Sequence, residues 1–296
     1  MIAAIASGKG GTGKTTVSAS LASIWTEALG RPVLAVDLDV EEPNLHLFLR
    51  PLIATSRVAR LEIPVVDALS CTRCGECREL CQFGAITILG DTPMVFAEMC
   101  HGCGGCLAVC PVGAITPGAR ELGCVEEGAA GAIGFLSGRL RVGESMSPPL
   151  IRAVTQRLEE LLGRSAPASL PDVLLDAPPG VSCPATAAVA VADCIVLVAE
   201  PTPFGVHDFK LAVEAFSPLG RPMGVVVNRA GSGDAALGRF CRQVGLPILA
   251  EIPDDRKVAE TYAQGGLLAE AAPAYRSLCL GLASAVAGLA GEVRHA

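Results

Sequence analysis

A glycine-rich segment near the N-terminus, residues 8–16 (GKGGTGKTT), separates two stretches with different hydrophobic patterns. Residues 1–7 form a short apolar run, which is typical of a buried strand. After the segment, apolar residues follow at helical spacing: Val17, Leu21, Ile24, Trp25 and Leu29. Gly30 and Pro32 then mark the end of this predicted helix. Residues 32–39 (PVLAVDLD) are a second apolar run that ends in acids, as in a fully buried parallel strand. The order strand, helix, strand predicts a βαβ unit in a parallel sheet.

Residues 8–16 also fit the phosphate-loop pattern G-x-x-x-x-G-K-[ST]. Glycines let backbone N–H groups turn inward around phosphate oxygens, and the following helix presents its positive end to the same anion. We expect Lys14 to reach the β- and γ-phosphates and the Thr15 hydroxyl to bind Mg²⁺. The flanking strand and helix argue against the alternative, a chance glycine-rich turn. The predicted nucleotide-binding residues of this loop are Gly8, Lys9, Gly10, Gly11, Thr12, Gly13, Lys14, Thr15 and Thr16.

The alternation of strands and helices stops near residue 60 and resumes after about residue 118. Further predicted strands cover residues 173–176, 194–199, 224–228 and 248–252. Predicted helices cover residues 148–162, 207–216, 235–244, 257–264 and 274–290. The predicted fold is therefore α/β, a doubly wound and mostly parallel sheet of the P-loop NTPase kind. The last helix is apolar over much of its circumference, and we expect it to pack on the sheet. A membrane-surface helix is the alternative, but only Arg276 and Arg294 lie nearby.

The chain has 13 cysteines, and eight of them lie between Cys71 and Cys110. They form two runs with the bacterial ferredoxin spacing C-x2-C-x2-C-x3-C, and both runs are followed by the sequence GAIT. A zinc site would show pairs of CxxC separated by longer gaps, which this stretch does not show. The segment resembles a two-[4Fe–4S] ferredoxin module, a small α+β domain inserted into the sheet protein. We expect the boundaries to be 1–62 and 119–296 for the ATPase domain and 63–118 for the insert.

The ferredoxin resemblance implies that each cluster takes three thiolates from one run and the fourth from the other. One cluster would be bound by Cys71, Cys74, Cys77 and Cys110, and the second by Cys100, Cys103, Cys106 and Cys81. Gln82 stands where a proline usually follows the fourth cysteine, which removes no ligand. We expect His101 to be an exposed neighbour of the second cluster rather than a ligand.

Five cysteines lie outside the two runs. Cys194, Cys241 and Cys279 are expected to be small buried hydrophobes. Cys124 lies in a glycine-rich stretch that the pattern does not assign. Cys183 lies seven residues after Asp176, the spacing of a dimer-bridging cluster ligand in nitrogenase iron proteins. A plain thiol in a loop is the favoured reading of Cys183, because no second cysteine clearly matches the other bridging ligand.

Lys9 makes the loop the deviant form K-G-G-x-G-K-T, which resembles the MinD, ParA and nitrogenase iron-protein superfamily over residues 1–60 and 119–296. The resemblance implies that Lys9 reaches across a nucleotide-bound dimer to the partner's phosphates. It implies that Asp39 positions the attacking water and that Asp176 holds Mg²⁺ through water. Asp37 is a weaker candidate near Mg²⁺.

The same resemblance assigns the base-binding side of the site. Asn228, at the end of GVVVN, matches the asparagine that contacts adenine. Pro253 and Asp254 resemble the loop on the other side of the base. The expected ligands are therefore ATP and Mg²⁺, and the expected assembly is an ATP-dependent homodimer or a heterodimer with a similar ATPase.

Composition limits the function further. The net charge is −7 with no basic block, which disfavours nucleic-acid binding. No apolar run reaches the ~20 residues of a membrane span, and the N-terminus has no basic segment of a signal peptide. We expect a cytoplasmic protein without a transmembrane segment, and we do not expect binding to a membrane surface.

The combination of motifs resembles MinD-superfamily P-loop ATPases with an inserted ferredoxin domain. This implies ATP binding and hydrolysis coupled to two [4Fe–4S] clusters, with ATP-gated electron transfer favoured. A positioning or assembly switch with redox-sensing clusters and an iron–sulfur cluster carrier are the alternatives. An unidentified redox or assembly protein would be the partner.

Overall fold

The computed structural model describes residues 1–164, 170–231 and 235–291. Within these ranges the chain forms a nine-stranded sheet in the order β11-β10-β9-β1-β8-β2-β7-β6-β3 and a two-stranded sheet of β4 and β5. The strands are β1 Ile2–Ala6, β2 Val33–Asp37, β3 Leu52–Val66, β4 Ile86–Leu89, β5 Thr92–Val95, β6 Ile115–Ala130, β7 Ile133–Leu140, β8 Asp172–Asp176, β9 Cys194–Ala199, β10 Met223–Ala230 and β11 Ile248–Pro253. From β11 to β7 neighbouring strands are parallel, whereas β6 and β3 are antiparallel to their neighbours.

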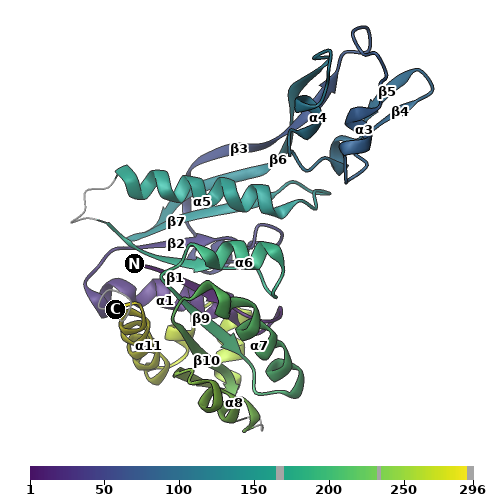
Figure 1. Ribbon diagram of the computed structural model, residues 1–296. Coiled ribbons are helices and arrows are strands. Elements are labelled where there is room, and N and C mark those ends of the chain that lie inside the picture. The colour runs from purple at the N-terminus through teal and green to yellow at the C-terminus, as the bar shows by residue number, and fades with distance from the viewer. Residues whose placement is uncertain (165–169, 232–234, 292–296) are drawn as a thin grey trace.

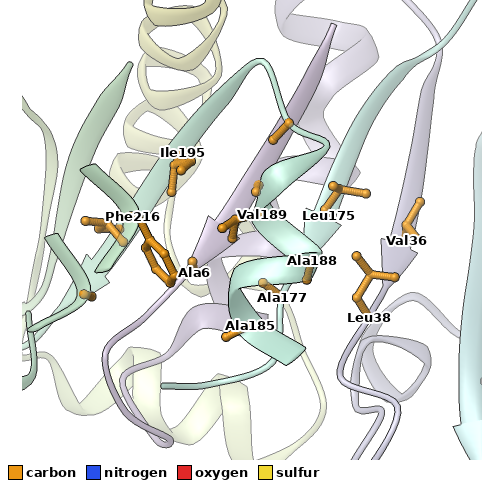
Figure 2. Packing of buried hydrophobic residues seen from close by; sticks show 14 of the residues in the cluster. Ala6, Val36, Leu38, Leu175, Ala177, Ala185, Ala188, Val189, Ile195 and Phe216 are labelled. Carbon is orange, nitrogen blue, oxygen red and sulfur yellow. The ribbon is translucent and has the colours of Figure 1, made fainter. Parts of the chain in front are cut away.

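Helices cover both faces of the large sheet (Figure 1). The helices of the described residues are α1 Lys14–Leu29, α2 Leu45–Leu49, α3 Glu76–Leu80, α4 Gly105–Ala108, α5 Ser147–Arg164, α6 Cys183–Ala190, α7 Pro203–Phe216, α8 Ala236–Val244, α9 Arg256–Ala263, α10 Leu268–Ala271 and α11 Pro273–Gly291. Of these, α3 and α4 lie beside β4 and β5, away from the faces of the large sheet (Figure 1). On one face, Val189 of α6 and Phe216 of α7 pack beside Ala6 and Leu175 of the sheet (Figure 2). On the other face, Trp25 of α1 and Val286 of α11 belong to a second buried cluster. Two separate cores, one on each face, confirm the doubly wound prediction.

The βαβ unit and the later strands lie where the sequence predicts them. Helix α1 contains the predicted apolar positions and ends at Leu29, directly before Gly30, and β9 has the predicted bounds. The strand expected at 248–252 is β11, Ile248–Pro253, and the last helix, expected at 274–290, is α11, Pro273–Gly291. Among the described residues α11 is the one helix that is long and apolar enough to cross a membrane. It packs against α1 and contacts β9, β10 and β11, as expected for a helix of the sheet.

The region without a predicted pattern contains a long antiparallel ribbon. Strand β3 pairs with β6 from Leu52 to Val66, whereas β6 pairs with β7 only from Gly123 onward. The rest of the ribbon therefore continues beyond the sheet and ends in the small group of α3, α4, β4 and β5 (Figure 1). The expected domain boundaries at 62/63 and 118/119 fall inside these two strands, so the insert and the sheet share continuous strands.

A β-bulge marks the point where the ribbon leaves the sheet. Ala59 pairs with Gly123 and the next residue, Arg60, pairs with Glu121, so Leu122 is the extra residue. Gly123 in turn lies opposite Leu140, the last residue of β7. Because β7 is parallel to β2, the ribbon projects from the carboxyl edge of the sheet. Bulges of this kind bend and twist a strand locally, which redirects the ribbon at this edge.

Candidate nucleotide site and cysteine module

The glycine-rich loop connects β1 to α1, and two of its glycines are required by close approach. Gly13 has φ +89°, and a Cβ at this position would overlap Nδ2 of Asn228. A Cβ on Gly8 would overlap the backbone carbonyl of Asp208 in α7. The loop is therefore confined between β10 and α7, and its path needs residues without side chains.

Lys14, Thr15 and Ser18, in the first two turns of α1, converge on Asp176 at the end of β8. Lys14 Nζ donates to Asp176 Oδ1 over 3.0 Å, and Thr15 Oγ1 donates to Oδ2 over 2.7 Å. Ser18 Oγ donates to Oδ1 over 2.8 Å. Ser18 was not among the predicted site residues, although its position one turn after Lys14 on the same helix could have indicated it. The Asp176 carboxylate is 1% exposed and is held by three donors where Mg²⁺ chemistry is expected.

Two further carboxylates follow β2. Asp39 Oδ2 lies 4.0 Å from Lys14 Nζ, and burial raises the pKa of Asp39 to about 6. Asp37 is fully buried, and burial together with the charge of Asp176 raises its pKa to about 8. Its oxygens accept hydrogen bonds from the backbone N–H groups of Asp39 and Leu45. Asp37 thus shapes the loop that presents Asp39, whereas Asp39 faces the lysine.

A cavity of about 530 Å³ opens beside the loop. Every residue from Lys9 to Thr16 lines it, and Asp39, Asn228, Pro253 and Asp254 line it as well. The hydroxyl of Thr12 is buried in the loop and has no hydrogen-bond partner among the described residues, so a phosphate oxygen would supply the missing contact. Val258 and Tyr262 of α9 also line the cavity and were not predicted. The cavity therefore joins the predicted phosphate-binding and base-binding residues in one site.

Asn228 connects the two ends of this site. Its Nδ2 donates to the backbone carbonyl of Thr12 over 2.7 Å, and its Oδ1 accepts from the N–H of Arg229.

Lys9 Nζ lies 3.4 Å from Glu200 Oε2, and Arg229 binds the other oxygen of Glu200 at 2.6 Å. Glu200 is buried after β9 and was not predicted, since no local pattern relates it to Lys9. The carboxylate holds two cations at the rim of the cavity.

The fold and this loop define a P-loop nucleotide-binding α/β protein. The family model described as the CobQ/CobB/MinD/ParA nucleotide binding domain matches residues 3–268. The chain therefore belongs to this family of MinD/ParA-type nucleotide-binding ATPases.

Relatives and solved structures agree with this assignment. The chain is 34% identical over 230 residues to the uncharacterized protein MJ0578 of Methanocaldococcus jannaschii, which covers 77% of this chain and 78% of that protein. It is 28% identical over 272 residues to the uncharacterized protein MJ0579 of the same organism, with 90% of each chain covered. Among solved structures, it is similar to the septum site-determining protein MinD of Pyrococcus horikoshii OT3 complexed with Mg-ADP. That match has a TM-score of 0.58, 25% identity, and covers 98% of this chain and 97% of the other.

The segment at the end of the ribbon, residues 67–114, is called the cysteine module below. Its two cysteine runs have the same backbone at equivalent positions. Gly75 and Gly104, which precede the third cysteines, have φ +88° and +70°, and Gly84 and Gly113 have φ +62° and +63°. A short helix, α3 or α4, follows each of the first two glycines. The internal repeat of the sequence is thus a repeat of the structure.

Backbone N–H groups donate to cysteine sulfurs in both halves of the cysteine module. The N–H of Ala85 donates to Cys81 Sγ and that of Ala114 to Cys110 Sγ, both over 3.3 Å. The N–H of Gly102 donates to Cys100 Sγ over 3.4 Å. Such bonds stabilise thiolates, which are the form of cysteine that binds metal.

The second predicted quartet surrounds one cavity. Cys81, Cys100, Cys103 and Cys106 all line an apolar space of about 70 Å³ between the two halves of the cysteine module. In the described residues, no group of three or more His, Cys, Asp or Glu side chains converges on a single metal ion. A cubane is wider than one ion and takes its thiolates around a larger volume.

The remaining candidates are placed as follows. The rings of His101 and Phe83 are stacked with centroids 3.5 Å apart, beside the same cavity. Cys194, Cys241 and Cys279 are buried, as expected. Cys183 is exposed, as a thiol in a loop would be, but it is the first residue of α6. The expected loop position is therefore wrong by one residue. Cys124 lies in β6, paired with Val58 of the ribbon.

Proposed function

We propose that this protein hydrolyses Mg-ATP in the cytoplasm and that its nucleotide cycle gates one-electron transfer through two [4Fe–4S] clusters in the cysteine module. One observation carries the proposal: the ribbon that bears the module leaves the sheet at its carboxyl edge, the edge at which the phosphate loop lies. Membership of the MinD/ParA-type family supports the ATPase part. The arrangement of the cysteines supports the redox part.

The side chains divide the nucleotide chemistry among them. Lys14 and the loop N–H groups would bind the phosphates, and Thr15 with Asp176 would hold Mg²⁺. Asp39 would orient the attacking water, because its carboxylate faces the lysine from the opposite loop. Lys9 would supply a positive charge to the phosphates of a second copy, in an ATP-dependent dimer.

The shared cavity of the second cysteine quartet supports the cluster part of the proposal. Cys81, Cys100, Cys103 and Cys106 would hold one cluster around their shared cavity. The first quartet, Cys71, Cys74, Cys77 and Cys110, would hold the other at the equivalent place of the repeat. When bound, such clusters accept and donate single electrons at potentials set by hydrogen bonds to sulfur and by solvent exposure.

A second candidate is a positioning or assembly switch in which the clusters sense redox state or dock a partner. The similarity to MinD of P. horikoshii favours it, since that structure is of a septum site-determining protein. The cluster-carrier alternative has less support, because CxxC pairs occur in this chain only inside the cysteine module.

Stopped-flow kinetics distinguish the two candidates. The anaerobically purified protein is reduced with dithionite, freed of excess reductant and mixed with an oxidised viologen in the presence of Mg-ATP or Mg-ADP. We expect faster oxidation with Mg-ATP, and no such acceleration in Lys14→Ala. Equal rates with both nucleotides in the wild-type protein would contradict gating and favour the switch.

A further inference from the structure

One acidic side chain of the cysteine module, Glu98, is ion-paired with arginines at the base of the ribbon. Glu98 lies two residues before Cys100, in a short turn of 3-10 helix. Its carboxylate accepts hydrogen bonds from Arg141 at 2.7 and 2.8 Å and from Arg120 at 3.3 Å. Arg120 belongs to β6 and Arg141 follows β7. A residue beside a predicted cluster ligand is thus bound to the base of the ribbon.

The two arginines lie on either side of the bulge at Leu122. Arg141 donates from its backbone N–H to the carbonyl of Leu122 over 2.9 Å and from Nε to the carbonyl of Glu121 over 2.8 Å. These contacts fix the point at which the ribbon bends away from the sheet (Figure 1). Glu98, at the far end of the ribbon, therefore binds the arginines at the point where the ribbon bends.

The inner side of this cluster is buried. Arg120 and Glu144 form an ion pair through Nη1 and Nη2 of the arginine, with side chains 7% and 2% exposed. Glu144 Oε1 also accepts from the N–H groups of Ser145 and Met146, immediately before α5. Buried pairs with this many hydrogen bonds have few alternative arrangements, so the contact is specific in geometry.

A short series of contacts joins this cluster to the nucleotide site. The N–H of Leu140 donates to the carbonyl of Val40 over 2.9 Å. Val40 is the neighbour of Asp39, whose carboxylate lies 4.0 Å from Lys14 Nζ. Leu140 is the neighbour of Arg141, which binds Glu98. The loop after β2 is therefore connected to the cysteine module by one backbone hydrogen bond and one ion pair.

We propose that Glu98, Arg120, Arg141 and Glu144 are positioning residues that lock the bend of the ribbon and couple the nucleotide site to the second cysteine quartet. The inference rests on the proposed nucleotide function. Such coupling is reciprocal: if nucleotide changes the state of the cysteine module, the module changes nucleotide affinity by the same factor. These four residues act by holding the ribbon in place, and none of them is assigned to nucleotide or cluster binding.

Hydrogen exchange measured by mass spectrometry tests this on the full chain, anaerobically, with and without Mg²⁺ and a non-hydrolysable ATP analogue. In the wild-type protein we expect the analogue to slow exchange in residues 8–16 and also in 97–106, by about fivefold or more. Glu98→Gln and Arg141→Gln should abolish the response in 97–106 and retain that in 8–16. The matched control is Glu79→Gln, an exposed acid two residues before Cys81, which should keep both responses.

Each outcome decides the matter. A response in 97–106 that survives in both Glu98→Gln and Arg141→Gln would overturn the lock. The proposed coupling would also be overturned if the analogue slowed exchange in residues 8–16 of the wild-type protein and left exchange in 97–106 unchanged. That result would leave the proposed nucleotide site intact. Loss of the response in Glu79→Gln would also overturn the lock, because loss of negative charge beside a cluster would then suffice. No protection of residues 8–16 would overturn the proposed nucleotide function together with the inference.

Discussion

Lys14 and Asp176 are joined by a 3.0 Å hydrogen bond between Nζ and Oδ1, with side chains 7% and 1% exposed. The bond connects the start of α1 to the end of β8. It places the cation expected at the phosphates and the carboxylate expected at Mg²⁺ in direct contact.

Lys14→Ala should lower ATP hydrolysis by about a hundredfold or more, because the site loses its cation at the transferred phosphate. The variant should also lose about 3 kcal/mol of stability, because it leaves a buried carboxylate without its cation. Phosphate release and urea denaturation measure the two effects. Lys257→Ala, in an exposed position of α9, is the matched control. Full turnover in Lys14→Ala would remove the phosphate-loop assignment.

Lys9→Ala should bind nucleotide as a monomer and fail to dimerise with the ATP analogue. The reason is that Lys9 lies at the rim of the cavity, where its ion pair with Glu200 leaves the side chain 31% exposed. Light scattering after gel filtration, with and without analogue, measures the assembly. Normal dimerisation of the variant would show that Lys9 has no role in trans.

Hydrolysis should fall at acid pH as Asp39 takes up a proton. Burial raises the pKa of Asp39 from 3.8 to about 6, so a carboxylate that orients water is lost below about pH 6. The folded protein also binds this proton more tightly than the unfolded chain. The free energy of unfolding contributed by Asp39 therefore decreases as pH rises between these two values. A pH–rate profile of Asp39→Asn should be low and lack the acid limb; an unchanged limb would assign it to another group.

Cys71→Ser and Cys103→Ser should each lower the iron content from about eight per chain to about four, because each removes a ligand of one cluster. Nucleotide should still bind, with its affinity changed only by the factor that reciprocal coupling to the cysteine module sets. The matched control is Cys183→Ser, an exposed thiol outside the cysteine module. Iron and sulfide assays check the result. Wild-type iron content in both variants would refute the ligand assignment, and loss of iron in the control would give Cys183 a role.

Asp172→Ala should destabilise the sheet core by about 2–4 kcal/mol. Asp172 accepts a 3.0 Å hydrogen bond from the indole of Trp25, and it also pairs with Arg31 and the N-terminal amine. Trp25 is the single tryptophan, so its fluorescence in urea measures the loss directly. Asp91→Ala, whose side chain is 91% exposed, should change little. Equal stability of Asp172→Ala and the wild-type protein would contradict the account.

The sheet and phosphate loop were predictable because their signals are local. Helix α1 shows its apolar spacing and its glycine end, and β2 and β9 are continuous apolar runs buried throughout. The cysteine spacing is equally local. Each of these elements is specified by residues that are close to one another in the sequence.

The ribbon could not be predicted in the same way. Most residues of β3 are exposed, and β6 contains proline, glycine and charged residues without a regular alternation. Apart from a short alternation of buried and exposed residues at 59–63, these strands are stabilised by pairing with each other, so the sequence shows little of an apolar face. The pairs Lys9–Glu200 and Glu98–Arg141 join residues far apart in the chain, so only the folded topology brings them together.

The coupling of the nucleotide site to the cysteine module is tested most directly by an anaerobic EPR redox titration of the reconstituted protein without nucleotide, with Mg-ADP, and with Mg²⁺ and a non-hydrolysable ATP analogue. We expect the analogue to shift a cluster midpoint potential by about 59 mV or more, which is tenfold in the equilibrium constant of a one-electron couple. The same potentials under all three conditions would contradict coupling between the two sites.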